Sequence, residues 1–147
     1  MELFFTPLHV FAAALVAFII GALWYSPIAF LKAYHIGEGL SKDHKQNLGV
    51  VYMLQIQVYS LVAHGAIAAV LAILFDIIGV ASLKLAVSLG LFFAFGFIVT
   101  SRFVDMLHTT KGKHYEKQAQ IKFLVSSGYY LTVVSAMSAV LFLLTVR

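Results

Sequence analysis

The longest apolar stretch of the chain runs from Gly49 to Ser101 and contains only two charged side chains, Asp76 and Lys84. A helix needs about 20 residues to cross a hydrocarbon core about 30 Å thick, and within lipid the backbone must satisfy its own hydrogen bonds. The stretch is more than twice that long. It therefore predicts two membrane helices that fold back on each other near the two charges.

Apolar runs on either side predict one further crossing each, so we expect a single all-α domain over residues 1–147 with four antiparallel transmembrane helices. Pro27 falls within the last turns of the first crossing, where its missing N–H predicts a bend near Tyr25. Gly79 and Ser82 predict a tight turn between the second and third helices, which should then be neighbours. The expected spans cover about residues 7–31, 49–78, 81–101 and 121–146.

The composition removes alternatives to a membrane protein. Apolar residues make up 62% of the chain and charged residues 11%, a balance that does not suit the surface of a water-soluble domain. The chain has no cysteine, which excludes disulfides, thiolate metal sites and cysteine nucleophiles. The first residues carry Glu2 and lack the basic segment of a cleavable signal, so we expect the first crossing to be retained.

Basic side chains are distributed unevenly between the two sides that four crossings define. By the positive-inside rule, loops 1 and 3 are expected to be cytoplasmic and both termini outside the cell membrane. The lysines also favour contact with anionic membrane lipids, and no basic domain is left to bind nucleic acid. Only Lys84 and Arg147 lie on the side opposite to Lys32, Lys42, Lys45, Arg102, Lys111, Lys113, Lys117 and Lys122.

The segment Trp24-Tyr25-Ser26-Pro27 closes the first crossing. Trp and Tyr are typical of the headgroup level and proline marks a bend, so an aromatic belt explains this composition. The order of residues from Gly21 to Pro27, followed by Phe30, Lys32 and Gly37, also resembles the opening signature of an uncharacterised family of small, mostly bacterial four-helix membrane proteins. Gly128-Tyr129-Tyr130 is similar to that family's last span. The resemblance implies a fold and a membrane location, and it supplies no catalytic residue.

His64 lies near the middle of the second crossing and shares a helical face with Gln57 and Ser60, at spacings of three and four residues. A polar stripe at this depth is expected to face the protein interior or a watery cavity. Two interpretations stay open. In the first, the imidazole binds a ligand or a proton, in a pocket bordered by these three residues together with Trp24 and Tyr25. In the second, a neutral histidine stabilises helix packing through a hydrogen bond to a serine or tyrosine of a neighbouring helix.

Two stripes of small side chains predict close helix packing, because small residues let helix backbones approach each other in lipid. One stripe is expected to pack within the chain, which leaves the other for a partner. We therefore expect a homodimer, and another membrane protein is the alternative partner. The stripes are Ala13, Ala17 and Gly21 in the first helix and Gly128, Thr132 and Ser135 in the last.

Arg102, Asp105 and His108 follow one another at three-residue spacing and share a face at the end of the third crossing. This pattern predicts interfacial salt bridges, with a gate or binding role as the alternative. No helical pair of histidines presets metal geometry, so we expect no metal and no cofactor. Phosphate-binding and serine-hydrolase motifs are also missing from the sequence, which argues against an enzyme.

Together these patterns predict a small, non-enzymatic integral membrane protein that is oligomeric and binds or passes a small solute, an ion or a lipid. The polar stripe and the aromatic bend favour this function, because they bring polar atoms and irregular backbone to membrane depth. The alternative is an accessory subunit that recognises another membrane protein through its small-residue helix faces.

Overall fold

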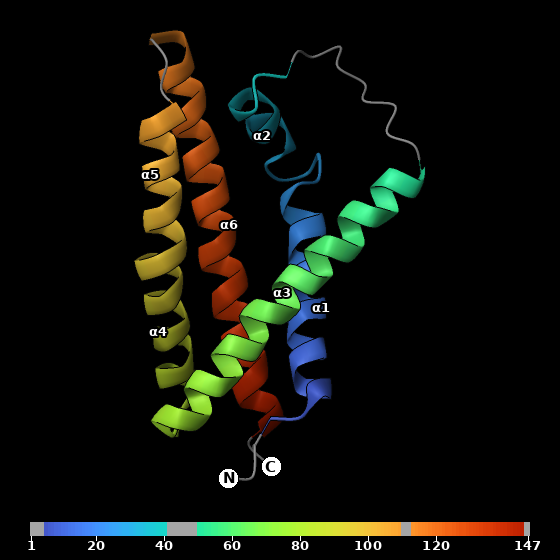
Figure 1. Ribbon diagram of the computed structural model, residues 1–147, viewed down its shortest axis with the longest axis vertical. Helices are drawn as coiled ribbons and strands as arrows, with labels where there is room; N and C mark the ends of the chain where they lie inside the picture. Colours follow the sequence, from blue (N-terminus) through green and yellow to red (C-terminus); the bar gives the residue numbers. More distant parts are fainter. Residues whose placement is uncertain (1–4, 41–49, 110–112, 146–147) are drawn as a thin grey trace.

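The protein is described here by a computed structural model that covers residues 5–40, 50–109 and 113–145, and these ranges contain helices and no strand (Figure 1). Four helical segments are long and apolar enough to cross a membrane, which confirms the predicted all-α fold with four membrane helices. The helices are α1 (Pro7–Trp24), α2 (Leu31–Gly37), α3 (Val50–Ile78), α4 (Leu83–Phe93), the π-helix η1 (Ala94–Val99), α5 (Thr100–Thr109) and α6 (Lys113–Thr145). Some predicted positions lie outside the described residues, namely Glu2, Lys42, Lys45, Gly49, Lys111, Val146 and Arg147.

The first crossing ends at Trp24 instead of residue 31, and a turn leads from there into the short helix α2. Pro27 has no N–H to donate to the Leu23 carbonyl, so the helix cannot continue through it. That carbonyl accepts hydrogen bonds from the Ser26 N–H at 3.2 Å and from Ser26 Oγ at 2.6 Å. The Trp24 carbonyl accepts from the Phe30 N–H at 2.9 Å. The bend predicted near Pro27 is therefore a helix end followed by a tight turn.

The third and fourth helical segments extend further than the sequence predicted. The third continues through η1 and α5 to Thr109 instead of ending at residue 101, and α6 begins at Lys113 instead of residue 121. Lys, Glu and Gln at the start of α6, and Arg, Met and Leu in α5, favour helix, so both segments continue it beyond the apolar span. A turn of the π-helix η1 contains more residues than a turn of an α-helix. This rotates the helix that follows, and so changes which side of α5 faces α6.

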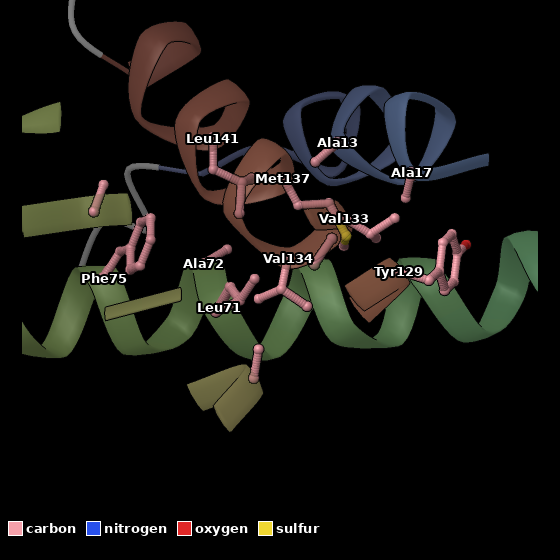
Figure 2. Close-up of a cluster of buried hydrophobic side chains, with 13 residues drawn as sticks. Ala13, Ala17, Leu71, Ala72, Phe75, Tyr129, Val133, Val134, Met137 and Leu141 are labelled. Carbon is pink, nitrogen blue, oxygen red and sulfur yellow. The ribbon is translucent and has the colours of Figure 1, made fainter. Parts of the chain in front are cut away.

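Helix α6 is the centre of the bundle, because α1, α2, α4 and α5 all pack against it, while α3 lies mainly on α1. Two α1 alanines, Ala13 and Ala17, are fully buried in the core, where their small side chains allow a close approach to α6. Figure 2 shows how these alanines and part of α3 surround the buried α6 side chains Tyr129, Val133, Val134, Met137 and Leu141.

Helix α3 crosses the bundle obliquely, and its first half diverges from the other helices (Figure 1). The predicted tight turn after α3 is present, with Gly79 at φ +70° and the N–H groups of Gly79 and Val80 both donating to the Phe75 carbonyl. The prediction that the two helices joined by this turn are neighbours is wrong, because α4 packs along α6 and not along α3. A tight turn fixes where two helix ends meet, whereas side-chain packing sets their angle.

Candidate functional site

A cavity of about 730 Å³ lies where α2, α5 and α6 meet, at the end of the bundle that carries the first and third loops. This volume falls within the usual range of small-molecule sites. The wall combines charged, polar and apolar side chains from the three helices. They are Glu38 from the end of α2, Arg102, Asp105, Met106 and His108 from α5, and Gln118, Ala119, Lys122, Phe123 and Ser126 from α6.

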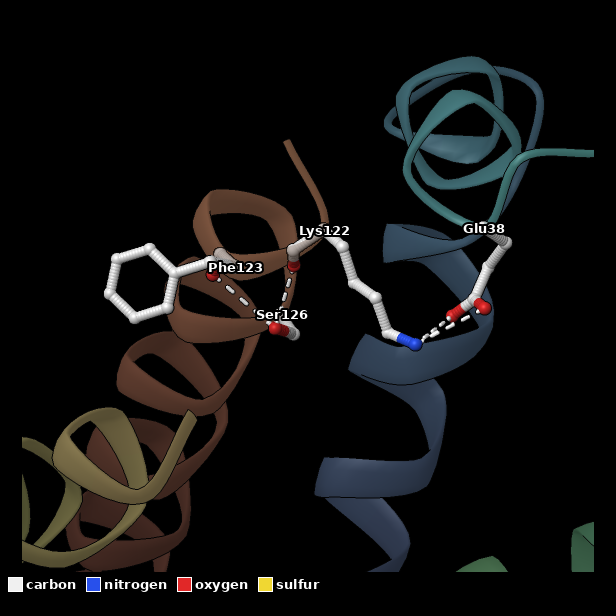
Figure 3. Close-up of polar contacts among 4 residues, drawn as sticks. All are labelled: Glu38, Lys122, Phe123 and Ser126. Atoms are coloured by element: carbon white, nitrogen blue, oxygen red, sulfur yellow. Dashed lines mark hydrogen bonds and ion pairs between the residues drawn. The ribbon is translucent and has the colours of Figure 1, made fainter. Parts of the chain in front are cut away.

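Glu38 and Lys122 form an ion pair on one side of this cavity (Figure 3). Lys122 Nζ lies 3.0 Å from Glu38 Oε1 and donates to Oε2 at 3.2 Å. The lysine side chain is 48% exposed and the glutamate side chain 28%, so solvent screens their attraction. Such pairs contribute at most about 1 kcal/mol. The pair therefore places two opposite charges at the cavity without adding much stability.

Backbone packing holds α2 against α6 at the same place. A Cβ atom at Gly37 would lie 2.8 Å from the backbone nitrogen of Lys122 and 2.9 Å from its Cα, so only glycine allows this approach. One turn further along α6, Ser126 Oγ donates to the carbonyls of Lys122 at 2.7 Å and Phe123 at 3.3 Å, as Figure 3 shows. Glu38 and Lys122 thus lie at the contact between two closely packed helices.

The predicted cluster of Arg102, Asp105 and His108 lines this cavity from α5. The Arg102 guanidinium lies over the Tyr130 ring, 5.5 Å from the ring centroid, which is a cation–π contact. His108 Nδ1 lies 2.9 Å from the Val104 carbonyl oxygen, and because a carbonyl only accepts, this nitrogen carries a proton. Over the described part of the chain, no three His, Asp or Glu side chains are close enough to hold a metal ion.

His64 points into the bundle and is 5% exposed. Its Nδ1 lies 2.6 Å from the Ser60 carbonyl oxygen, and its Nε2 lies 2.8 Å from the Tyr129 hydroxyl. The carbonyl can only accept, so Nδ1 carries the ring proton and Nε2 of the neutral ring accepts the Tyr129 O–H. Both ring nitrogens are therefore engaged, which is the geometry expected of a histidine that locks helix packing.

Tyr129 is not among the predicted site residues, yet it contacts three of the five residues of the predicted pocket, His64, Trp24 and Tyr25. Its hydroxyl oxygen would lie 2.9 Å from a Cβ atom at Gly21, so glycine leaves room for it on α1. Its ring centroid lies 6.2 Å from that of Trp24 and 5.2 Å from that of Tyr25. Trp24 Nε1 also donates to the Val125 carbonyl at 3.2 Å. The signal for Tyr129 in the sequence is the Gly-Tyr-Tyr motif, which by itself does not tell which tyrosine points inward.

Aromatic rings connect the His64–Tyr129 pair with the cavity. The Tyr25 ring contacts Tyr34 of α2 at 5.0 Å between centroids, and the Tyr129 ring contacts Tyr130, on which Arg102 lies, at 5.1 Å. Burial, together with the negative charge of Glu38, raises the pKa of the Tyr34 phenol, so it stays neutral at physiological pH. The buried histidine and the charged cavity are thus parts of one continuous packed region.

The structure separates Gln57 from the other residues of the predicted pocket. Ser60 lies beside His64, with its Oγ 3.4 Å from His64 Nδ1, and both Trp24 and Tyr25 meet His64 through Tyr129. Gln57 is exposed, because the first half of α3 diverges from the bundle. The four clustered residues therefore form a packed contact between α1, α3 and α6.

The two predicted small-residue stripes lie in different surroundings. Ala13 and Ala17 are buried, whereas Gly128 is half-buried, and a Cβ atom there would lie 3.2 Å from Trp24 Cζ2. Thr132 is exposed and Ser135 is half-buried, and their hydroxyls donate to helix carbonyls one turn earlier at 2.9 Å and 2.6 Å. The α6 stripe thus lies partly on the outer surface of the bundle.

Comparison with known protein families shows where the chain belongs. The family described as "Protein of unknown function (DUF1761)" matches residues 8–142. The chain is a member of this family. This confirms the resemblance to a family of unknown function, and the match covers nearly all of the four crossings, together with the cavity and the His64–Tyr129 pair. No curated protein and no solved structure matches the chain. Membership of the DUF1761 family brings no activity with it, so the function is argued from the geometry.

Proposed function

We propose that this protein is a non-enzymatic membrane protein that binds a small amphipathic solute or lipid in the cavity between α2, α5 and α6. The observation that carries the proposal is the cavity of about 730 Å³, whose wall places both charge signs beside apolar side chains. In the proposed orientation this end of the bundle faces the cytoplasm, because loops 1 and 3 hold most of the basic residues. The cavity then lies at the inner surface of the cell membrane.

The charges of the wall indicate a zwitterionic ligand. Arg102 and Lys122 are balanced by Glu38 and Asp105, so the formal charges of these four side chains sum to zero. Ser126 and Gln118 add neutral hydrogen-bonding groups, and Met106 and Phe123 add apolar surface. A ligand with both charge signs and an apolar part complements such a wall better than a bare ion does. A phospholipid headgroup and a free zwitterion share this chemistry.

Filling the cavity should abolish binding. Ala119 lies on the wall and is 8% exposed, so Ala119→Leu extends a side chain into the space where the ligand is expected. We expect native mass spectrometry of protein from phosphatidylethanolamine vesicles to detect one tightly bound lipid on the unchanged protein. The variant should lose at least about tenfold in affinity for it. Competition with glycerophosphoethanolamine, which has the headgroup without acyl chains, distinguishes a free solute from a lipid.

The matched control is Ala66→Leu, which adds the same atoms at an exposed position of α3. It should retain the bound lipid. Equal loss in both variants, full retention by Ala119→Leu, or binding of neither probe to the unchanged protein would each rule out the proposed site.

The His64–Tyr129 hydrogen bond bears on whether the ligand also passes through the bundle. The pair is buried where α1, α3 and α6 meet, and both imidazole nitrogens are engaged. A solute moving beyond the cavity would have to break this contact and separate the helices. For this arrangement of the helices we therefore propose binding and not passage.

The first half of α3 supports a second part of the proposal, that two copies of the chain associate. All side chains from residue 54 to 59 are exposed in the single chain, on a helix long and apolar enough to cross a membrane. Gln57 is among them, and lipid solvates its amide poorly. In a symmetric dimer each copy would cover this surface of the other, and the two amides could hydrogen-bond across the interface.

Gln57→Leu is expected to weaken such a dimer by about 0.6 kcal/mol and by no more than about 1.7 kcal/mol, the mean and the largest values measured for hydrogen bonds between membrane helices. Energy transfer between labelled copies in vesicles measures the association. Gln120→Leu, which makes the same change at an exposed position of α6, should have no effect. A monomer in vesicles would refute the dimer, and stoichiometric copurification of a different membrane protein would favour the accessory-subunit alternative.

A further inference from the structure

A second cavity, of about 290 Å³, lies at the opposite end of the bundle, where α3 turns into α4. Asp76 and Thr145 contribute polar atoms to its wall, and Phe5, Phe75 and Phe142 contribute aromatic rings. None of these residues belongs to the larger cavity, so the inference drawn from them is independent of the function proposed above.

Asp76 is half-buried and provides an acceptor atom without a hydrogen-bond partner among the described residues. Its Oδ2 atom is buried, and no hydrogen bond reaches it from the described residues. Leaving a carboxylate oxygen desolvated and unpaired is unfavourable. No basic side chain belongs to the described wall of this cavity. Asp76 lies on the cavity wall, so a cation that enters would meet a carboxylate whose charge no described side chain neutralises.

The neighbouring polar groups also favour a cation. Thr145 Oγ1 donates its proton to the Leu141 carbonyl at 2.6 Å, so toward the cavity this oxygen can only accept. Helix α3 ends at Ile78, two residues after Asp76, and the last carbonyls of a helix carry partial negative charge. The backbone N–H groups of Gly79 and Val80, which could have attracted an anion, are both used in bonds to the Phe75 carbonyl.

The aromatic part of the wall indicates what kind of cation fits. The Phe5 and Phe75 rings lie 6.3 Å apart between centroids, and Phe142 adds a third ring. The faces of aromatic rings attract organic ammonium ions. A Ca²⁺ or Mg²⁺ ion requires about six oxygen ligands, whereas this wall offers one carboxylate and one hydroxyl among its side chains.

We propose that this cavity binds a small organic ammonium ion, with Asp76 as its counter-ion and the three phenylalanine rings around its alkyl groups. The volume lies at the lower limit of small-molecule sites, so the ligand has about the size of choline. This site is separate from the proposed zwitterion site at the other end of the bundle, so an experiment can refute either proposal without refuting the other.

The test compares choline with 3,3-dimethylbutan-1-ol, which has the same shape without the charge. Calorimetric titration of the purified protein should show saturable choline binding, and the uncharged alcohol should bind at least about tenfold more weakly. This comparison needs no variant, so it does not depend on how a substitution folds. Equal binding of both compounds would show a merely apolar cavity, and absence of choline binding up to about 20 mM would overturn the proposal.

Two variants test whether the ion binds next to Asp76. Asp76→Asn keeps the shape of the side chain and removes its charge, and it should weaken choline binding at least about tenfold while leaving the binding of the alcohol unchanged. Glu116→Gln, at an exposed position at the other end of the bundle, removes the same charge and should leave choline binding unchanged. If the two variants bind choline equally, the ion lies elsewhere and the assignment to Asp76 is wrong.

Discussion

His64→Ala is expected to lower the free energy of unfolding by about 2–4 kcal/mol, because it removes a buried side chain and leaves the Tyr129 hydroxyl without its acceptor. The ring is 5% exposed and accepts from Tyr129 across the contact between α3 and α6. Thermal unfolding in detergent, followed by the intrinsic fluorescence of Trp24 next to Tyr129, measures the loss.

A double-mutant cycle separates the hydrogen bond from the cavity that the alanine leaves. Tyr129→Phe removes only the hydroxyl, and the coupling between the two changes should be about 0.6–1.7 kcal/mol, as for other hydrogen bonds between membrane helices. Tyr59→Phe is the matched control, because Tyr59 is 69% exposed on the same helix as His64. Zero coupling, or an equal loss in Tyr59→Phe, would contradict the packing role of His64.

Gly90→Ala is expected to destabilise the bundle by about 1–3 kcal/mol, because it overpacks the contact between α4 and α6. A Cβ atom at this position would lie 2.9 Å from Ser138 Cβ, closer still to Ser138 Oγ, and 3.2 Å from the Val134 carbonyl oxygen. Ser138 is fully buried, so its side chain has little room to move away. The same unfolding measurement in detergent detects the change.

The chain offers a control and a rescue for this prediction. A Cβ atom at Gly65 would meet nothing within 4 Å, so Gly65→Ala should leave stability unchanged or raise it by up to about 1 kcal/mol through helix propensity. Combining Gly90→Ala with Ser138→Gly makes room on the facing helix and should recover part of the lost stability. If Gly90→Ala is as stable as the unchanged protein, the close approach of α4 and α6 is wrong.

The candidate sites were only partly visible in the sequence. The spacing of Arg102, Asp105 and His108 predicts a shared helix face, and the structure shows which neighbours that face meets, namely α6 and the end of α2. Glu38 and Lys122 are 84 residues apart, and no local pattern indicates that they form an ion pair. Gln57 and His64 share a face in the sequence, yet one is exposed and the other buried, because α3 diverges from the bundle between them.

The sequence by itself determined the membrane class and the four crossings, and it predicted a bend near Pro27, where the structure has a helix end. These features follow from local physics: apolar length must match the bilayer, and proline cannot continue a helix. The tertiary structure decided that α6 is the central helix, that Tyr129 is the partner of His64, and that cavities lie beside Lys122 and Asp76. These features depend on helix angles, which arise from contacts between residues far apart in the chain, such as Gly21 with Tyr129 and Gly90 with Ser138.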